Sequence, residues 1–219
     1  MKTIAIIVAG GRGKRLGRPK QFLKINGKPM LAWTVNAFQQ VKSIDGIIIV
    51  AAADQLALAK KIRASKVIAI VAGGARRQDS VRHGLAALPK GAQIVLIHDG
   101  ARPAVTSIVI NKSIKAAREY GAAIAAVPVK DTLKIVDRRS SVVSETFDRD
   151  TIWAAQTPQT FTAPVIKKAY ERLEHDVTDD AMAVEQLGIP VRIVMGSYEN
   201  IKVTTPEDLA VVGIILKGR

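Results

Sequence analysis

The segment that decides the fold is Thr3-Ile4-Ala5-Ile6-Ile7-Val8, which continues directly into Ala9-Gly10-Gly11-Arg12-Gly13-Lys14-Arg15-Leu16-Gly17-Arg18-Pro19-Lys20. The first six residues form a short apolar run and predict a buried strand. The next twelve contain four glycines and five basic residues, with no acidic residue among them. Glycines let backbone N–H groups approach a ligand, and Arg and Lys donate charge-assisted hydrogen bonds to phosphate oxygens. The segment therefore predicts a strand that ends in a polyphosphate-binding loop.

This loop does not match two well-known phosphate-binding motifs. A P-loop needs Ser or Thr after Gly13-Lys14, where Arg15 stands. A dinucleotide-binding loop needs a glycine where Leu16 stands and an acid about 20 residues further on, but residues 28–41 contain no acid. Both motifs are excluded. The alternative is a surface turn with a solvated basic run, which the position of the glycines directly after a buried strand disfavours.

The composition limits the class of protein. A chain of 219 residues with 48% apolar residues is long enough for one sizeable α/β domain, which we expect to span residues 1–219. The sequence has no cysteine, and its three scattered histidines match no zinc motif, so thiol catalysis and thiolate metal sites are excluded. The apolar start is too short for a signal peptide, and no apolar run approaches the length of a membrane span. We expect a soluble, cytoplasmic protein without a membrane partner.

The charge indicates an anionic partner. Lys and Arg number 33 against 19 acids, which gives a net charge of +14. Such a field favours anions, including nucleic acid. However, the basic residues are spread along the chain, and aromatic residues, which stack on bases, make up only 4%. A polyanionic small substrate is therefore the favoured partner, and nucleic acid is not expected to be one.

Apolar runs of strand length alternate with helical patterns along the chain. The expected strands after the first are 47–51, 67–71, 94–97, 122–127 and 191–195, and the expected helices are 30–40, 55–65, 80–88 and 107–120. This alternation predicts a doubly wound α/β fold, Rossmann-like, with a mostly parallel sheet and helices on both faces. Ligands bind such sheets beyond the carboxyl ends of the strands. The glycine-rich loop and His98-Asp99-Gly100-Ala101-Arg102-Pro103 should therefore lie at one edge.

One segment, at about residues 131–153, breaks the alternation. The turn-like residues 137–141 separate two half-polar runs, 132–136 and 142–147, in a hairpin pattern that is too polar for the sheet. We expect a β-arm that projects from the body and packs on another subunit. An ordinary solvent-exposed hairpin is the alternative.

Three further stretches carry candidate site residues. Gly73-Gly74 follows a strand and precedes Asp79-Ser80. Either Asp79 or Ser80 could be a helix N-cap. The glycine pair could present backbone groups to a flat base. Asp99, at a strand end, could bind Mg²⁺ or a substrate hydroxyl, or serve as a cap or as a partner of Arg102. Thr205 caps a helix that begins with Pro206. Lys202, three residues before Thr205, has no role in starting this helix and is a candidate site residue.

Several motifs occur in one order along almost the whole chain: Ala9-Gly10-Gly11-x-Gly13-x-Arg15, Pro19-Lys20-Gln21, Gly73-Gly74 with Asp79-Ser80-Val81, His98-Asp99-x-Ala101-Arg102-Pro103, Asp148-Arg149, Thr157-Pro158-Gln159, Thr178-Asp179 and Ile201-Lys202-Val203-Thr204. In this set the chain closely resembles the 2-C-methyl-D-erythritol 4-phosphate cytidylyltransferases of the non-mevalonate isoprenoid pathway. It departs from the usual family pattern at Ala75, Gly100 and Arg18.

The resemblance implies a role for each matching residue. Residues implied to bind CTP are Ala9, Gly10, Gly11, Gly13, Arg15, Lys20, Gly74, Ser80 and Asp99, with Gly74 and Ser80 at the cytosine. Residues implied to bind the polyol phosphate are Asp99, Arg102, Thr132, Arg149, Thr157, Thr178 and Lys202. The implied catalytic set is Arg15, Lys20, Lys202 and Arg149. The resemblance also implies Mg²⁺ or another divalent cation, held by Asp99 or otherwise by the CTP phosphates. The arm would carry Arg149 into the site of a neighbouring subunit in a homodimer.

The implied reaction suits these residue types. A phosphate monoester attacks the α-phosphorus of CTP and pyrophosphate leaves, so the nucleophile is already an anion and needs no general base. Basic residues then neutralise two polyanions. One alternative is a ribitol 5-phosphate cytidylyltransferase. Another is a guanylyltransferase with a similar loop, but Thr157-Pro158-Gln159 and Lys202 argue against the guanylyltransferase. A non-catalytic basic nucleic-acid-binding α/β protein is the alternative from another class.

Overall fold

The computed structural model describes residues 2–11 and 20–218. A seven-stranded sheet lies at the centre, in the order β11-β7-β10-β6-β1-β4-β5, and all neighbours are parallel except β10, which runs antiparallel to β6 and β7. Its strands are β1 (Lys2–Ala9), β4 (Gly46–Ala51), β5 (Val67–Ala72), β6 (Ala92–Asp99), β7 (Ala122–Pro128), β10 (Trp153–Thr162) and β11 (Arg192–Met195). The helices are α1 (Met30–Gln39), α2 (Leu56–Ala59), α3 (Arg77–Ala86), α4 (Ser107–Tyr120), α5 (Ala163–Glu171), α6 (Asp180–Glu185) and α7 (Pro206–Lys217).

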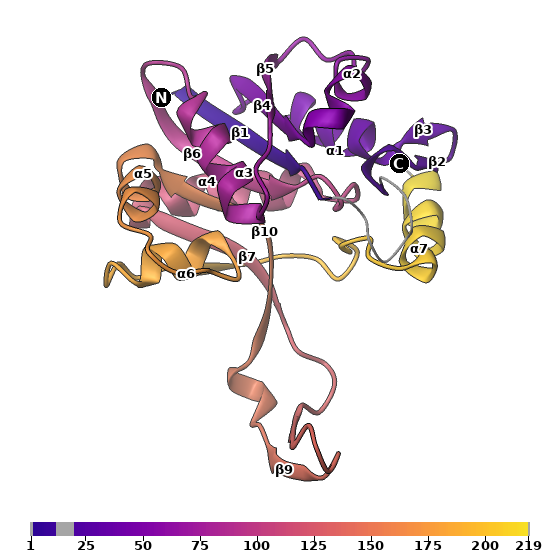
Figure 1. Ribbon diagram of the computed structural model, residues 1–219, viewed down its shortest axis with the longest axis vertical. Coiled ribbons are helices and arrows are strands. Elements are labelled where there is room, and N and C mark those ends of the chain that lie inside the picture. The colour runs from indigo at the N-terminus through magenta and orange to yellow at the C-terminus, as the bar shows by residue number, and fades with distance from the viewer. Residues whose placement is uncertain (1, 12–19, 219) are drawn as a thin grey trace.

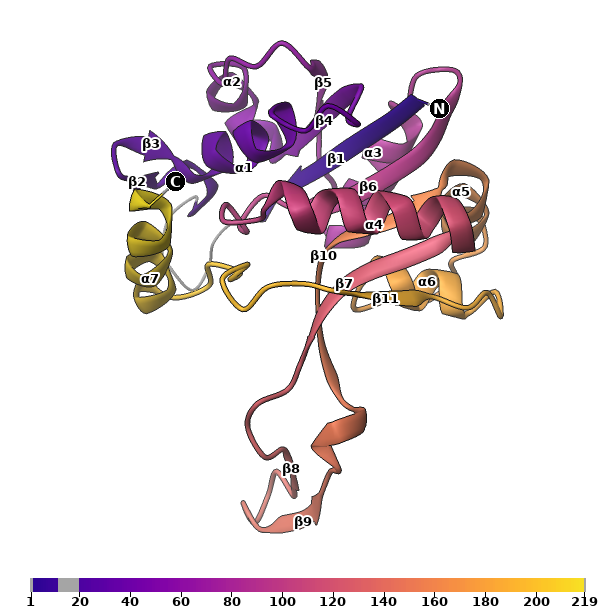
Figure 2. The ribbon, with the colours of Figure 1, turned by 180° about the vertical axis from the view of Figure 1, so that it is seen from behind.

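The first strand shows why helices cover both faces of the sheet. Successive side chains of a strand point to opposite faces. Ile4 and Ile6 pack with residues of α3, α5 and α6, whereas Ala5 and Ile7 pack with residues of α1 and α4. All four are fully buried. The strand therefore has an apolar core on each side, with the helices arranged as in Figures 1 and 2. The predicted doubly wound α/β class is confirmed.

Two helices differ from the expectation. The helix expected over 55–65 ends at Ala59, because tertiary contacts fix the following chain: Lys66 N donates to Gln39 Oε1 and Lys66 Nζ to Val41 O. The helix expected over 80–88 begins earlier, at Arg77. Its cap is a box in which Asp79 Oδ2 accepts from Arg76 N, so neither Asp79 nor Ser80 is the N-cap.

Strand β10 was not predicted from the sequence. Its central residues Gln156, Thr157 and Gln159 are polar and flank a proline, a composition that favours a turn. All three are nevertheless buried, because their side chains find hydrogen-bond partners inside the protein. The strand enters between β6 and β7, and its pairing with β7 is irregular between Ala155 and Gln159.

The predicted arm is confirmed as part of the fold. The antiparallel strands β8 (Lys134–Val136) and β9 (Val143–Thr146) and the 3-10 turn η4 (Arg149–Thr151) extend away from the body between β7 and β10 (Figures 1 and 2). At the root, Val129 N donates to Ile152 O and Tyr198 Oη donates to Pro128 O, at 3.1 and 2.9 Å. The ammonium group of Lys130 lies 3.7 Å from the centroid of the Tyr198 ring.

The C-terminal helix packs beside a small hairpin formed by β2 (Lys24–Ile25) and β3 (Lys28–Pro29). Thr205 and Asp208 form a capping box at the start of α7, which confirms the helix start predicted at Thr205-Pro206. Among residues 2–11 and 20–218, none of the helices combines the length and the apolar character that crossing a membrane requires.

Candidate active site

The candidate site lies beyond the carboxyl end of β6. Strand β6 ends at Asp99, and Gly100 N donates to Val8 O of β1 at 2.9 Å, so the ends of the two central strands are joined. A pocket of about 250 Å³ opens there. Its lining residues come from distant parts of the chain and are Arg77, Asp99, Arg102, Ala155, Gln156, Thr157, Gln159, Thr178, Asp179 and Lys202. Five sequence-predicted residues (Asp99, Arg102, Thr157, Thr178 and Lys202) thus come together.

Three cations surround the carboxylate of Asp99. Lys202 Nζ lies 2.9 Å from Asp99 Oδ2, Arg77 Nε lies 3.2 Å from Oδ1, and Arg102 Nε lies 3.6 Å from Oδ2. Burial alone would raise the pKa of Asp99, but Arg77, Lys202 and Arg102 lower it well below its usual range. Asp99 is therefore a fixed negative charge that orients three basic side chains.

These surroundings do not fit the predicted role of Asp99 as a metal ligand. Both carboxylate oxygens already accept from cationic side chains, and three positive charges oppose the approach of a fourth. Across the part of the chain that the structure describes, no group of three or more His, Cys, Asp or Glu side chains is arranged to hold a metal ion. The donor set therefore does not fit a protein-held cation at Asp99.

Arg77 links this pocket to a buried acid, and sequence reasoning assigned it no role. Its guanidinium donates to both oxygens of Asp180, at 3.0 and 2.7 Å, as well as to Asp99. Burial alone would lower the pKa of Arg77, but the negative charges of Asp180 and Asp99 outweigh burial and raise this pKa above its usual range. The Asp180 side chain is fully buried and also accepts from Tyr170 Oη at 2.6 Å. The only sequence signals were the positions of Arg77 after the glycine pair and of Asp180 after Thr178-Asp179.

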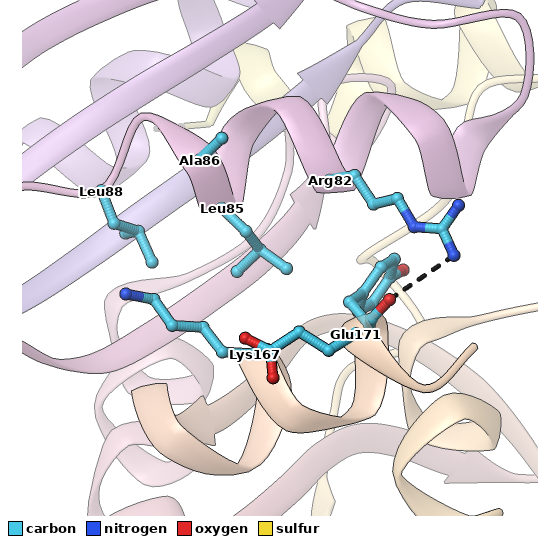
Figure 3. A pocket seen from close by; sticks show the side chains of 7 residues that line it. Arg82, Leu85, Ala86, Leu88, Lys167 and Glu171 are labelled. Atoms are coloured by element: carbon cyan, nitrogen blue, oxygen red, sulfur yellow. Dashed lines mark hydrogen bonds between the residues drawn. The ribbon is translucent and has the colours of Figure 1, made fainter.

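Tyr170 also borders an open groove of about 420 Å³ between α3 and α5. Arg82 and Leu85 of α3 face Lys167 and Glu171 of α5 across it (Figure 3). Arg82 Nη2 donates to Leu173 O at 2.8 Å and to Tyr170 O at 3.5 Å. These bonds join α3 to the C-terminal end of α5. Tyr170, whose hydroxyl donates to Asp180, lies at that end of α5.

A buried histidine positions Thr157. His98 is fully buried, and burial lowers its pKa to about 4, so the ring is neutral near pH 7. Because Arg102 O lies 3.2 Å from Nε2 and can only accept, Nε2 carries the proton and Nδ1 accepts from Thr157 Oγ1 at 3.0 Å. Thr157 Oγ1 in turn accepts from Asp99 N at 3.1 Å. The hydroxyl predicted to bind substrate is thus fixed against the end of β6.

Gln159 fixes the substrate-side turn. Its Oε1 accepts from Asp180 N and Ala181 N, both at 2.9 Å, and its Nε2 donates to Asp179 Oδ2 at 2.8 Å. The amide therefore holds the first turn of α6 beside the pocket. Thr178, just before this turn, is exposed, and its hydroxyl donates to Met182 Sδ at 3.6 Å.

Lys20 lies next to the Lys202 segment. Lys20 Nζ donates to Val203 O at 2.9 Å, and Val203 N donates to Ala101 O at 2.8 Å. Arg102 Nη1 donates to Asn200 O at 2.7 Å on the same segment. The end of the glycine-rich loop, the residues after β6 and the residues before α7 are thereby tied together, and Lys20 is brought to the pocket side of the molecule.

The predicted nucleotide-side glycines also meet. A Cβ added to Gly73 would lie 2.7 Å from Ser80 Oγ, and one added to Gly10 would lie 3.1 Å from it, so the two glycine turns pack closely on this serine. Ser80 is buried; its hydroxyl accepts from Gly74 N and donates to Arg76 O, at 3.1 and 3.2 Å. Ser80 therefore shapes the turn. Ala9 ends β1 and Gly11 follows Gly10, whereas Gly13 and Arg15 lie outside the described residues.

Two predicted residues do not join the pocket of their own chain. Thr132 and Arg149 belong to the projecting arm, where both are exposed. Arg149 Nη1 donates to Lys130 O at 3.1 Å across the base of the arm. Neither residue lines the pocket beside Asp99.

A doubly wound α/β sheet with clustered basic residues and glycines at its carboxyl edge is an arrangement that nucleotidyltransferases use. The family model described as 2-C-methyl-D-erythritol 4-phosphate cytidylyltransferase (IspD) matches residues 3–218. The chain therefore belongs to this family. That membership accounts for the order of the motifs from the first loop to Lys202.

Individual relatives agree. The protein of this name from Alkaliphilus oremlandii is 48% identical over 228 residues, which cover 100% of this chain and 96% of the relative. The one from Geobacter metallireducens is 43% identical, with coverage of 100% and 99%. A crystal structure of 4-diphosphocytidyl-2C-methyl-D-erythritol synthase from Anaerococcus prevotii is 35% identical and superposes with a TM-score of 0.87, covering 99% of this chain and 96% of that one.

Proposed function

We propose that the chain transfers CMP from CTP to 2-C-methyl-D-erythritol 4-phosphate and releases pyrophosphate. A phosphate oxygen of the polyol forms a bond to the α-phosphorus of CTP while the bond from that phosphorus to the bridging oxygen of pyrophosphate breaks. The observation that carries the proposal is the cluster of Arg77, Arg102 and Lys202 around one fixed carboxylate, in a chain that belongs to the cytidylyltransferase family. The predicted cytoplasmic location stays a prediction.

The basic residues would lower the electrostatic cost of bringing two polyanions together. Asp99 holds Lys202 and Arg102 in place before substrate arrives, so little reorganisation is needed when charge develops at the transferring phosphoryl group. Lys20 enters from the neighbouring turn, and the family resemblance gives Arg15 the same charge-neutralising role. The Thr178 hydroxyl would donate or accept a hydrogen bond at the polyol, whereas Thr157 Oγ1, whose proton is donated to His98, would only accept one. No general base is required, because the attacking phosphate is already ionised.

The family generally uses a divalent cation. Because the surroundings of Asp99 oppose a cation there, we propose that the ion enters with the CTP phosphates and is not held by Asp99. Gly10, Gly11, Gly73 and Gly74 would present backbone groups to the nucleotide, with Gly74 at the cytosine edge.

The arm suggests how the site is completed. The arm exposes apolar side chains, among them Val142 at 61%, Val143 at 52% and Phe147 at 43%. Exposed apolar groups on a projecting hairpin favour contact with a second protein surface. We propose a homodimer in which Thr132 and Arg149 reach the partner's pocket, where the guanidinium of Arg149 would bind substrate phosphate bidentately.

A pyrophosphate-release assay tests this function. Methylerythritol phosphate and ribitol 5-phosphate are offered in parallel with each of the four nucleoside triphosphates. We expect turnover with CTP and methylerythritol phosphate, and a preference for CTP over GTP of about 10⁴, because a site that hydrogen-bonds one base edge leaves buried groups unpaired with another. Faster turnover with ribitol phosphate would overturn the substrate assignment, and equal turnover of CTP and GTP would overturn base recognition.

A further inference from the structure

A second cavity lies beside η2 (Lys20–Phe22), which contributes Phe22 to its lining. It has a volume of about 430 Å³ and is bordered by the β2–β3 hairpin, one side of α1 and the chain that follows α2. These three segments lie side by side in Figures 1 and 2. The cavity and the pocket beside Asp99 have no lining residue in common.

The inner surface of this cavity is apolar. Phe22, Ala32 and Val35 form one part of the lining, and Leu58 and Ile62 form another. Leu58 is 41% exposed although it is a large aliphatic side chain. A volume in this range is typical of small-molecule sites, whose walls are mostly hydrophobic. The surface therefore fits the apolar body of a small molecule.

The charged residues at the cavity are all basic. Lys24 and Lys28 lie on the hairpin, Lys61 and Arg63 lie on the chain after α2, and no acid lines the cavity. Lys28 Nζ lies 4.8 Å from the centroid of the Trp33 ring. Within residues 2–11 and 20–218, the side chains of Lys24, Lys61 and Arg63 form no ion pair and no hydrogen bond. Like charges gathered around an apolar surface attract an anionic group to its edge.

We propose that this cavity binds a small amphipathic anion, with its apolar body against Leu58 and Phe22 and its phosphate or other anionic group among Lys24, Lys61 and Arg63. The charge complementarity selects an anion, and the apolar lining selects a ligand with a hydrophobic tail rather than inorganic phosphate. Since Phe22 and Lys20 belong to the same 3-10 turn, the site also adjoins the turn that carries a proposed catalytic lysine.

Titration calorimetry with octyl phosphate below its micellar concentration tests the proposal. Inorganic phosphate and octanol serve as probes of each half alone. We expect octyl phosphate to bind in the presence of saturating CTP and methylerythritol phosphate with an affinity within twofold of that without them. Each half-probe should bind at least about tenfold more weakly, because each lacks one of the two interactions.

Variants locate the binding. Lys24→Ala/Lys61→Ala should weaken octyl phosphate about tenfold, and Leu58→Ser about fivefold. Matched controls are Lys90→Ala/Lys112→Ala, which removes the same charge from exposed positions elsewhere, and Ile108→Ser, at a side chain that is 65% exposed. Both controls should bind within twofold of the unchanged protein.

Three outcomes would overturn the proposal. Binding that the substrates abolish would place octyl phosphate in the active site. Equal binding of inorganic phosphate would show an adventitious anion. Binding to anionic phosphatidylglycerol vesicles without binding of monomeric octyl phosphate would show a membrane surface instead. Since none of these readouts measures turnover, failure of this proposal and failure of the proposed function remain distinguishable.

Discussion

The Arg77–Asp180 pair should be a major source of both stability and site geometry. We consider the change Arg77→Gln, which removes the guanidinium but keeps a polar side chain of moderate size. Asp180 is fully buried and would keep one strong donor outside its own turn, Tyr170 Oη at 2.6 Å. Breaking a buried pair by removing one partner costs about 3–5 kcal/mol, because an uncompensated charge remains in the interior. Arg77 keeps some solvent contact, so we expect a loss of about 3 kcal/mol.

A double-mutant cycle separates the pair from its surroundings. Asp180→Asn should cost about 2 kcal/mol, less than Arg77→Gln, because Arg77 keeps Asp99 as a partner. If the pair interacts as the geometry indicates, Arg77→Gln/Asp180→Asn should be more stable than the sum of the single changes by about 2 kcal/mol. The free energies of unfolding are measured by urea titration, with Cm compared at constant m-value. Thermal unfolding gives a check, since 3 kcal/mol corresponds to roughly 6–12 °C for a domain of this size.

The matched control is Arg76→Gln. Arg76 is adjacent and pairs with Asp79 and Asp176, but it is exposed and its pairs are screened by solvent, so its loss should destabilise the protein clearly less than the loss of Arg77. A loss below 1 kcal/mol for Arg77→Gln, or strict additivity in the cycle, would refute the idea that a desolvated ion pair joins α3 to α6.

The other predictions concern pH, catalysis and assembly. Burial lowers the pKa of His98 to about 4, so the unfolded chain binds more protons than the folded one between about pH 4 and 6.5. The free energy of unfolding should therefore fall by about 3 kcal/mol as the pH drops through that window. In urea titrations, His98→Gln should flatten this dependence on pH. Lys202→Ala should lower kcat in pyrophosphate release by roughly 10²–10³, whereas Lys112→Ala should leave it unchanged; a change in KM alone would instead indicate ground-state binding. Co-folding Lys20→Ala with Arg149→Ala, each nearly inactive, should restore roughly a quarter of wild-type sites, because about half of randomly mixed dimers are mixed and each holds one intact site. Flat activity with mixed dimers confirmed by mass would mean that Arg149 serves its own chain.

Much of the fold followed from local patterns. The segment 107–120 matches α4 residue for residue, and the strand expected over 122–127 matches β7 to within one residue. Both have strong local signals: a helical apolar stripe behind the Thr106 cap, and a continuous apolar run. The helix expected over 55–65 failed because periodicity cannot show that Lys66 bonds to the end of α1. Strand β10 was missed because its buried polar residues have the composition of a turn.

The candidate site divides in the same way. Asp99, Lys202 and Thr157 could be singled out because each belongs to a short motif with a recognisable local position. The sequence could not show that Lys202 and Arg77 would bind the same carboxylate, nor that this carboxylate would therefore be a poor metal ligand. Ser80 could be named as a site residue, but the close approach of Gly10 to its hydroxyl depends on how two distant loops pack.

The sequence by itself determined the alternating strands and helices, the glycine pair that follows β1, the projecting arm and the helix start at Thr205. Each of these depends on the burial or the backbone freedom of neighbouring residues, which a short stretch of sequence records. Only the tertiary structure decided the charge arrangement of the site. Arg77 and Asp180 are 103 positions apart, and Arg77 and Asp99 are 22 apart. Ion pairs over such separations depend on the path of the chain around the sheet, because electrostatic attraction acts on distance in space and leaves no periodic trace in the sequence.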